Sequence, residues 1–248
     1  MKLRRPPRRD EAAEGPARDP GAGDQLLRQG LGRIGLQATS AQLEAFALYR
    51  SELLRWAARV NLTGFRTEGA IVREGFLRSL SYRAAFEPSP GLRAVDIGSG
   101  AGFPGLVLKI CYPEIDMLLV EAARRRATFL RSLIRQLGLT GARCLHARAE
   151  QLHSEAAHAA RYHLAFARAV GSLVEVVALA EPLLAPGGRL VLQVGQRTAQ
   201  SLDELRPRLA TLGLKAGVCE SPVVDPMAPP TKLLAVEKLS SAGPSNFA

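Results

Sequence analysis

Short apolar runs recur at regular intervals from residue 91 onward, and polar segments of helical character separate them. Five of the runs are LRAVDI, DMLLVE, ARCLHA, YHLAFA and GRLVLQV. The segments between them, 103–111, 122–138, 150–157 and 172–185, are helix-like. Apolar strands that alternate with helices are typical of a parallel sheet covered on both faces. Two later runs, LKAGVCE and KLLAVEKL, predict two more strands, one of them antiparallel, and so an α/β fold with a mostly parallel seven-stranded sheet.

The residues before this region follow a helical pattern instead. Thr39 and Gln42 resemble a capping box, which predicts a helix start. Apolar residues then recur near helical spacing from Leu43 to Val60, and the sequence NLTG at 61–64 ends the predicted helix. A further helix is predicted over about residues 68–84.

The chain therefore divides into four segments. Residues 24–87 form an N-terminal helical extension, and residues 88–239 form the α/β domain. Residues 1–23 mix Arg, Pro, Gly and acids with almost no large apolar side chain, which predicts a disordered tail, and residues 240–248 are similar. Arginines at positions 4, 5, 8 and 9 offer a contact to RNA, but nearby acids nearly cancel their charge, so a solvated tail is the preferred interpretation.

Composition narrows the class of partner. The net charge is +10 with a pI near 10.2, which indicates a polyanionic partner such as nucleic acid; an arginine-rich proteome is the alternative explanation. The three cysteines are far apart and the four histidines form no ligand cluster, so we expect neither a disulfide framework nor a metal site. No apolar run approaches the roughly 18 residues of a membrane helix, and no secretory signal is visible, so we expect a cytoplasmic protein.

A glycine-rich loop follows the first predicted strand. It reads Gly-Ser-Gly-Ala-Gly-Phe-Pro-Gly over residues 98–105. Phe103 stands where a dinucleotide fingerprint needs its third glycine, and no Gly-Lys-Ser/Thr ending marks a P-loop. The pattern acid-apolar-Gly-x-Gly-x-Gly, with Asp96 as the acid, fits the first motif of S-adenosylmethionine methyltransferases. Glycines here let the backbone approach a ligand at a helix N-terminus.

Acidic residues follow the next two strands at suitable positions. Glu121 ends the second run, 23 positions after Gly98, and is expected to accept both ribose hydroxyls. Ala149 and Glu150, in the sequence ARAEQL after the third run, lie where an adenine ring would bind. The alternatives are an exposed helix N-terminal acid for Glu121 and a loop-capping turn residue for Asp96.

These motifs resemble a known family. The sequences VDIGSGAGFPGLVL, VEAARRRATFLRSLIRQLGL, RAEQL, ARAVGSL and LAPGGRL are similar to the bacterial ribosomal RNA small subunit methyltransferase G family, also called glucose-inhibited division protein B. NLTGF matches the helical region of that family, and the similarity spans about residues 24–238. The resemblance implies a Rossmann-like class I methyltransferase domain over 88–239. It also implies N7-methylation of a guanine in the 530 loop of 16S rRNA, with S-adenosylmethionine as the cofactor.

The chemistry of that reaction is simple. Guanine N7 carries a lone pair and no proton, so its methylation needs no general base, and the sulfonium group activates the methyl without a metal. The enzyme has to align the nucleophile, the methyl carbon and the sulfur. Arg168, at the carboxyl edge after the fourth strand, matches a family arginine and would donate to guanine O6 or to a phosphate. A helix-capping or ion-paired arginine is the alternative.

The candidate site residues follow from these steps. Arg124 and Arg125, beside the cofactor mouth, are the preferred RNA contacts, with a solvated basic face as the alternative. Arg168 is the predicted catalytic residue. The predicted cofactor-binding residues are Asp96, Gly98, Ser99, Gly100, Gly102, Phe103, Glu121, Ala149, Glu150 and Arg168.

The chain departs from the family pattern at three positions. Gly75 stands where the family usually has a histidine, Arg78 where it has an aspartate, and Val194 where it tends to have a lysine. These changes affect placement of the base more than binding of the cofactor. They allow a weaker enzyme, a related enzyme with another guanine target, or replacement by arginines such as Arg73 or Arg78.

Two other functions remain open from the sequence. One is a methyltransferase of the same fold with a different RNA or small-molecule target, and the other is a catalytically silent RNA-binding protein. Loss of activity at raised salt would argue against a small-molecule enzyme. We expect a monomer; the sequence leaves open the modified nucleotide and the choice between naked rRNA and the 30S subunit as substrate.

Overall fold

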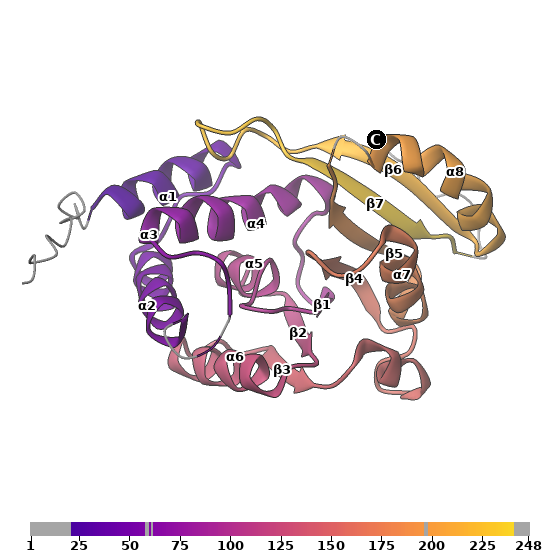
Figure 1. Ribbon diagram of the computed structural model, residues 1–248, viewed down its shortest axis with the longest axis horizontal. Helices are drawn as coiled ribbons and strands as arrows, with labels where there is room; N and C mark the ends of the chain where they lie inside the picture. The colour runs from indigo at the N-terminus through magenta and orange to yellow at the C-terminus, as the bar shows by residue number, and fades with distance from the viewer. Residues whose placement is uncertain (1–20, 58–59, 61, 196–197, 241–248) are drawn as a thin grey trace, which may run out of the picture.

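A seven-stranded sheet forms the centre of the molecule (Figure 1). The computed structural model describes residues 21–57, 60, 62–195 and 198–240, so the predicted tails lie almost wholly outside the described residues. The strand order is β3-β2-β1-β4-β5-β7-β6. The strands are β1 Arg93–Ile97, β2 Asp116–Glu121, β3 Ala142–His146, β4 Tyr162–Ala167, β5 Leu184–Gln193, β6 Leu214–Glu220 and β7 Lys232–Lys238. Strands β1 to β5 are parallel, which confirms the predicted class of sheet.

The last two strands complete the sheet, and the direction of β7 is opposite to that of its neighbours. Strand β7 inserts between β5 and β6 and is antiparallel to both, so the antiparallel strand predicted from the sequence is confirmed. Strand β5 begins four residues before the predicted run, at Leu184, and its pairing with β4 shifts register between Tyr162 and Leu164. The irregular pairing accommodates the Pro-Gly-Gly sequence at 186–188, which a regular central strand disfavours.

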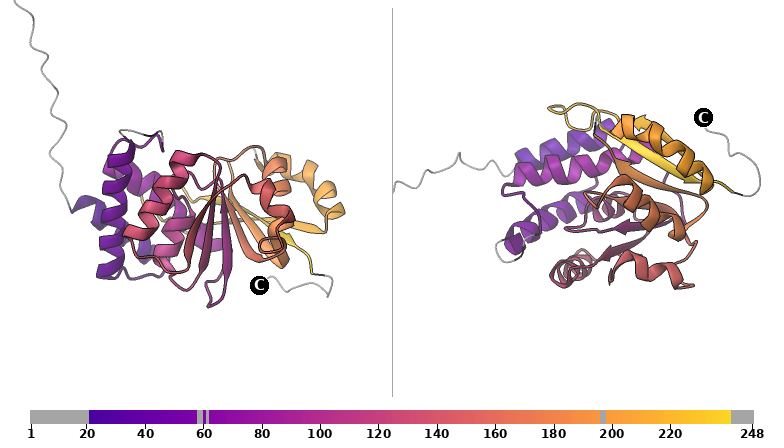
Figure 2. Two further views of the ribbon diagram at one scale, coloured as in Figure 1. Left: turned by 90° about the horizontal axis from the view of Figure 1, so that it is seen from below. Right: turned by 45° about the vertical axis from the view of Figure 1, so that its right-hand side comes forward.

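Helices cover both faces of the sheet (Figure 2). Side chains alternate between the faces along a strand, so Ala94 and Val95 of β1 belong to different hydrophobic cores. The first core packs under the N-terminal helices, α5 (Gly105–Cys111) and α6 (Arg124–Gln136). The second packs under a 3-10 helix at Ala149–Ser154, α7 (Leu173–Ala180) and α8 (Thr198–Thr211). Helix α8 was not predicted from the sequence.

The N-terminal extension is helical as predicted. Its elements are α1 (Ala22–Arg33), α2 (Ser40–Ala57) and a helical run from Glu68 to Ala85. The capping box before α2 is confirmed: the Thr39 N–H donates to Gln42 Oε1 at 3.0 Å, and the Gln42 N–H donates to Thr39 Oγ1 at 3.2 Å. Within the helical run, α3 (Glu68–Ala70) and α4 (Arg78–Leu80) flank a π-helix at Ile71–Leu77, and a 3-10 helix at Ser81–Ala85 ends it.

Candidate functional site: a glycine loop under a helical extension

The glycine-rich loop joins β1 to α5 at the carboxyl edge of the sheet. Gly98, Gly100 and Gly102 have φ values of +66°, +58° and +101°, in the left-handed region that favours glycine. At Gly98 a Cβ atom would also lie 2.6 Å from Val170 Cγ2, in the loop after β4. The loop therefore takes a path that side chains would forbid, close to the ends of β1 and β4.

Asp96 is buried beneath this loop. Its Oδ2 accepts the Gly105 N–H at 3.0 Å, and the Ser99 hydroxyl donates to its backbone carbonyl at 2.8 Å. A Cβ atom on Gly105 would be 2.7 Å from Oδ2, so this approach needs a glycine. Asp96 Oδ1 is buried with no hydrogen-bond partner among the described residues. Burial raises the pKa of Asp96 to about 7. One carboxyl oxygen is thus available to a polar group of a ligand.

Glu121 ends β2 beside the same loop. Glu121 is only 2 % exposed, so the alternative of an exposed helix N-terminal acid is wrong. Oε2 accepts the Gly100 N–H at 2.9 Å, and Oε1 accepts the Ala123 N–H at 2.7 Å. Arg126 Nε lies 3.1 Å from Oε1 and balances the charge. Glu121 therefore ties the glycine loop to the start of α6.

The other predicted residues on this edge lie in separate positions. Ala149 is buried and Glu150 is exposed at the start of the 3-10 helix after β3. Arg124 and Arg125 are exposed in the first turn of α6, and neither guanidinium has an ion-pair partner among the described residues. Cations at a helix N-terminus are unfavourable with the helix dipole, so these two arginines are not explained by helix stability.

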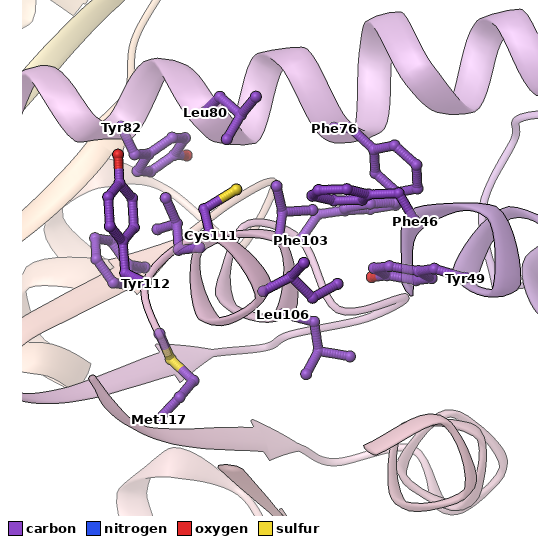
Figure 3. Close-up of a cluster of buried hydrophobic side chains, with 14 of the residues drawn as sticks. Phe46, Tyr49, Phe76, Leu80, Tyr82, Phe103, Leu106, Cys111, Tyr112 and Met117 are labelled. Carbon is purple, nitrogen blue, oxygen red and sulfur yellow. The ribbon is translucent and has the colours of Figure 1, made fainter. Parts of the chain in front are cut away.

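The Phe103 side chain turns away from the sheet edge and into the helical extension. Its ring stacks on Tyr49 with a centroid distance of 5.6 Å and lies 6.1 Å from Phe76 (Figure 3). The Tyr49 hydroxyl in turn donates to the Ala101 carbonyl at 2.7 Å. Burial raises the pKa of Tyr49 well above its ordinary value, so the hydroxyl stays neutral and remains a donor. Phe103 thus joins the glycine loop to the extension.

Arg168 lies between that ring and the helical run above it. Its guanidinium carbon is 5.8 Å from the centroid of the Phe103 ring, and its Nη2 donates to the Glu74 carbonyl at 2.5 Å. Its Nη1 is buried without a hydrogen-bond partner among the described residues. The structure thus brings Arg168 together with Phe103 at the loop, and leaves one donor of this arginine available.

The three departures from the family pattern have different surroundings. A Cβ atom on Gly75 would lie 2.7 Å from Phe103 Cζ, so the Phe103 ring occupies the space that a side chain at this position would need. Arg78 and Val194 line a cavity of about 400 Å³ beside β5. Val194 also lines a second cavity of about 230 Å³ between the ends of β4 and β5. Of these three positions, only position 75 therefore has no room for a larger side chain.

Several residues that make contacts in this region were not identified from the sequence. The Tyr82 hydroxyl donates to the Ala167 carbonyl at 3.2 Å and accepts the Gln193 N–H at 3.3 Å, which connects the ends of β4 and β5. Tyr49 and Tyr82 occupy apolar positions of the helical pattern, and nothing local marks their hydroxyl contacts. Glu74 was also not predicted as a site residue. Its backbone carbonyl accepts from Arg168 and its side chain pairs with Arg78, and both contacts are seen only in the folded chain.

Other features lie away from this edge. A cavity of about 540 Å³ opens at the amino ends of the strands, lined by Arg93, Asp116 and Tyr162 among others, on the edge opposite the predicted site. The described part of the chain contains no group of three or more His, Cys, Asp or Glu side chains that could hold a metal ion. In that same part, no helix has the length and apolar character needed to cross a membrane.

Structures with the same fold include known methyltransferases. A Corynebacterium glutamicum protein superposes with a TM-score of 0.53 at 20 % identity, over 87 % of this chain and 97 % of that one. Geranyl diphosphate methyltransferase, solved in complex with GPP and sinefungin, gives a TM-score of 0.53 at 14 % identity, over 81 % of this chain and 100 % of that one. The sheet order and these likenesses give the chain the class I methyltransferase fold.

Sequence relatives are much closer. A protein of Chloroflexus aggregans named Ribosomal RNA small subunit methyltransferase G is 37 % identical over 90 % of this chain and 93 % of that protein. A protein of the same name from Geobacter sp. is 37 % identical over 79 % of this chain and 88 % of that protein. The sequence profile of the family GidB, rRNA small subunit methyltransferase G, matches residues 42–221. This chain therefore belongs to the rRNA small subunit methyltransferase G family.

Proposed function

We propose that the protein transfers the methyl group of S-adenosylmethionine to N7 of a guanine in the 530 loop of 16S rRNA. Membership of the family supports the reaction, and the buried carboxylates around the glycine loop support the cofactor. The structural observation that carries the cofactor part of the proposal is Asp96 Oδ1, a buried acceptor without a partner among the described residues, placed under a loop of positive-φ glycines. The rRNA substrate is supported by membership of the family. Because the substrate is ribosomal RNA, we place this activity in the cytoplasm.

The residues present fit S-adenosylmethionine. Asp96 would accept from the ammonium of its methionine part, directly or through water, and Glu121 would accept from the ribose hydroxyls. Glu121 already has three protein donors, and they hold its carboxylate in one orientation. Ser99, through its bond to the Asp96 carbonyl, keeps the loop start in place. When bound, the cofactor supplies an activated methyl group on a sulfonium.

The remaining task of the chain is to align the target base. Methylation of N7 consumes a lone pair, so the arginine near the site must not occupy N7 itself. Arg168 Nη1, the donor left without a partner among the described residues, is placed to bind O6 or a phosphate instead. Its Nη2 bond to the Glu74 carbonyl and its position over the Phe103 ring limit its motion, which favours a reproducible geometry.

The RNA backbone would be bound beside the cofactor. Arg124 and Arg125 are exposed, have no ion-pair partner among the described residues, and follow Glu121 by three and four positions. The positive end of the helix dipole disfavours these two cations, whereas the negative phosphates of RNA would bind them favourably. The net charge of +10 is consistent with attraction of the whole protein to RNA.

The test is transfer of labelled methyl from S-adenosylmethionine to unmodified 16S rRNA and to 30S subunits lacking the modification, with the labelled base mapped. Label at guanine N7 in the 530 loop is the expected result. Label on another nucleotide would identify a different target, and no label from a protein that still binds the cofactor would mean that the departures at Gly75, Arg78 and Val194 changed the target or silenced the enzyme. Comparison of the two substrates shows whether assembly is required.

A further inference from the structure

The cavity of about 400 Å³ adjoins the proposed site of methyl transfer. It lies between the π-helix at Ile71–Leu77, the end of β5 and the loop that joins β6 to β7. Arg168 connects the two places, because its Nη2 donates to the backbone carbonyl of Glu74, a residue of the cavity wall. The residues that matter for the argument are Arg73, Glu74, Arg78, Glu220, Asp225 and Lys232.

The charges of this wall balance. Arg73 pairs with Asp225 at 2.5 Å, and Arg78 pairs with Glu74 at 2.8 Å. The remaining pair, Lys232 with Glu220, has an N–O distance of 3.6 Å. A phosphate needs an excess of cations, whereas a neutral nucleobase needs donors and acceptors side by side. The balanced wall therefore favours a base over a phosphate.

The Glu74–Arg78 pair offers the pattern that guanine needs. The two side chains are 45 % and 46 % exposed, so both are accessible from the cavity. The ion pair joins Arg78 Nη1 to Glu74 Oε2, and each side chain carries a second polar atom, Arg78 Nη2 and Glu74 Oε1. Guanine presents O6, N1–H and N2–H in a row on its Watson–Crick edge. A guanidinium that donates to O6 beside a carboxylate that accepts N1–H and N2–H matches this row.

We infer that Glu74 and Arg78 recognise the Watson–Crick edge of the target guanine in this cavity, an assignment that rests on the proposed function. Recognition at this edge leaves N7, on the opposite side of the ring, free to attack the methyl carbon. Adenine has an amino donor in place of O6 and an unprotonated N1. Its amino group would therefore face the Arg78 guanidinium, donor against donor, and its N1 would face the Glu74 carboxylate, acceptor against acceptor. The pair thus sets base specificity, and Arg78 contributes although it replaces the usual acid of the family.

The experiment compares guanosine with inosine at the target position of the RNA substrate. Inosine lacks only the N2 amino group, so it keeps O6, N1–H and N7. In the wild-type protein, kcat/KM is expected to be about tenfold to a hundredfold lower for inosine, because a charged acceptor that the base covers would then have no donor. In Glu74→Gln, kcat/KM for guanosine should fall to near the inosine value, so that the ratio of the two approaches one.

The control is Glu87→Gln. Glu87 pairs with Arg83 at the same i,i+4 spacing, near the end of the same helical run, and neither residue lines the cavity. This variant should keep the wild-type ratio, and both variants should bind S-adenosylmethionine as tightly as the wild type, which shows that they fold. Two results overturn the assignment: a wild-type ratio near one, or an undiminished ratio in Glu74→Gln. A wild-type protein that methylates no 530-loop guanine instead overturns the proposed function, and the assignment with it.

Discussion

Gly75 lies against the ring of Phe103 so closely that a Cβ atom on Gly75 would be 2.7 Å from Phe103 Cζ. Gly75 belongs to the helical extension, and Phe103 belongs to the glycine loop of the α/β domain. Together with the contacts of Tyr49, these two residues join the extension to the loop that we propose binds the cofactor. The histidine that the family resemblance leads us to expect at position 75 would compete with this ring for space.

We expect Gly75→Ala to lower the free energy of unfolding by about 1–3 kcal/mol, because its methyl group overpacks against Phe103. In a Phe103→Leu background the same substitution should cost less, since the ring is gone. Urea unfolding measures both. Gly69→Ala is the control: nothing lies within 4 Å of a Cβ atom there, so it should not destabilise the protein. An equal cost in both backgrounds would contradict the contact.

Asp96 should make stability depend on pH in a defined direction. Burial raises its pKa from 3.8 to about 7, so the folded state holds the proton more tightly than the unfolded state. The contribution of Asp96 is therefore most favourable below about pH 4 and declines as the pH rises to about 7. The stability of wild type relative to Asp96→Asn should fall over this window, as measured by denaturant unfolding of the cofactor-free protein. A difference that stays constant with pH would contradict the buried carboxyl.

Glu121→Ala should weaken S-adenosylmethionine binding by about tenfold or more, because it removes the proposed ribose acceptor and the bond to the Gly100 N–H. Isothermal calorimetry measures the affinity. Glu114→Ala is the control, since Glu114 is an exposed acid in the loop between α5 and β2. Unchanged affinity in Glu121→Ala would exclude the ribose assignment.

Arg168→Ala should lower turnover by about a hundredfold and leave cofactor affinity near the wild-type value, because this arginine aligns the base. It should also lower stability, since the substitution removes the bond to the Glu74 carbonyl. Single-turnover kinetics and calorimetry separate the two effects. Equal losses in affinity and turnover would count against a role toward the substrate.

Arg124→Glu and Arg125→Glu should each weaken RNA binding and lower its salt dependence. For a single-stranded segment, the slope of log K against log salt should fall by about 0.7 for each phosphate that the variant no longer binds. Arg161→Glu, an exposed residue just before β4 at the amino edge of the sheet, makes the same change in charge and should keep the slope. The same slope in all three variants would assign the effect to net charge alone.

The local elements could be predicted because their causes are local. The apolar runs predict β1 to β4 within about one residue of their ends. Strands β1, β2 and β4 are mostly buried and so need largely apolar sequences, whereas β3 at the edge of the sheet has no fully buried residue. Thr39 and Gln42 mark the start of α2 because both capping bonds form within one turn. Helix α8 lies in a polar segment that contains Pro207, and its sequence gives a weak helical signal.

The site could be predicted only in part, because some of its contacts join residues that are far apart in the sequence. The motif placed Asp96, Gly98, Gly100 and Glu121 around one loop, because parallel strands bring their carboxyl ends to one edge. The role of Phe103 was expected at the cofactor, yet its ring packs on Tyr49, which lies 54 positions earlier in the chain. No local pattern reports such a contact.

The sequence by itself determined the alternation of strands and helices from β1 to β5, the glycine loop, and the acids near the ends of β1 and β2. Each of these depends on residues a few positions apart, whose spacing sets backbone conformation and burial. Only the tertiary structure decided that Gly75 makes room for Phe103, that Arg168 donates to the Glu74 carbonyl, and that Arg73 pairs with Asp225 across 152 positions. These contacts arise from packing between distant segments, and packing is set by the whole fold.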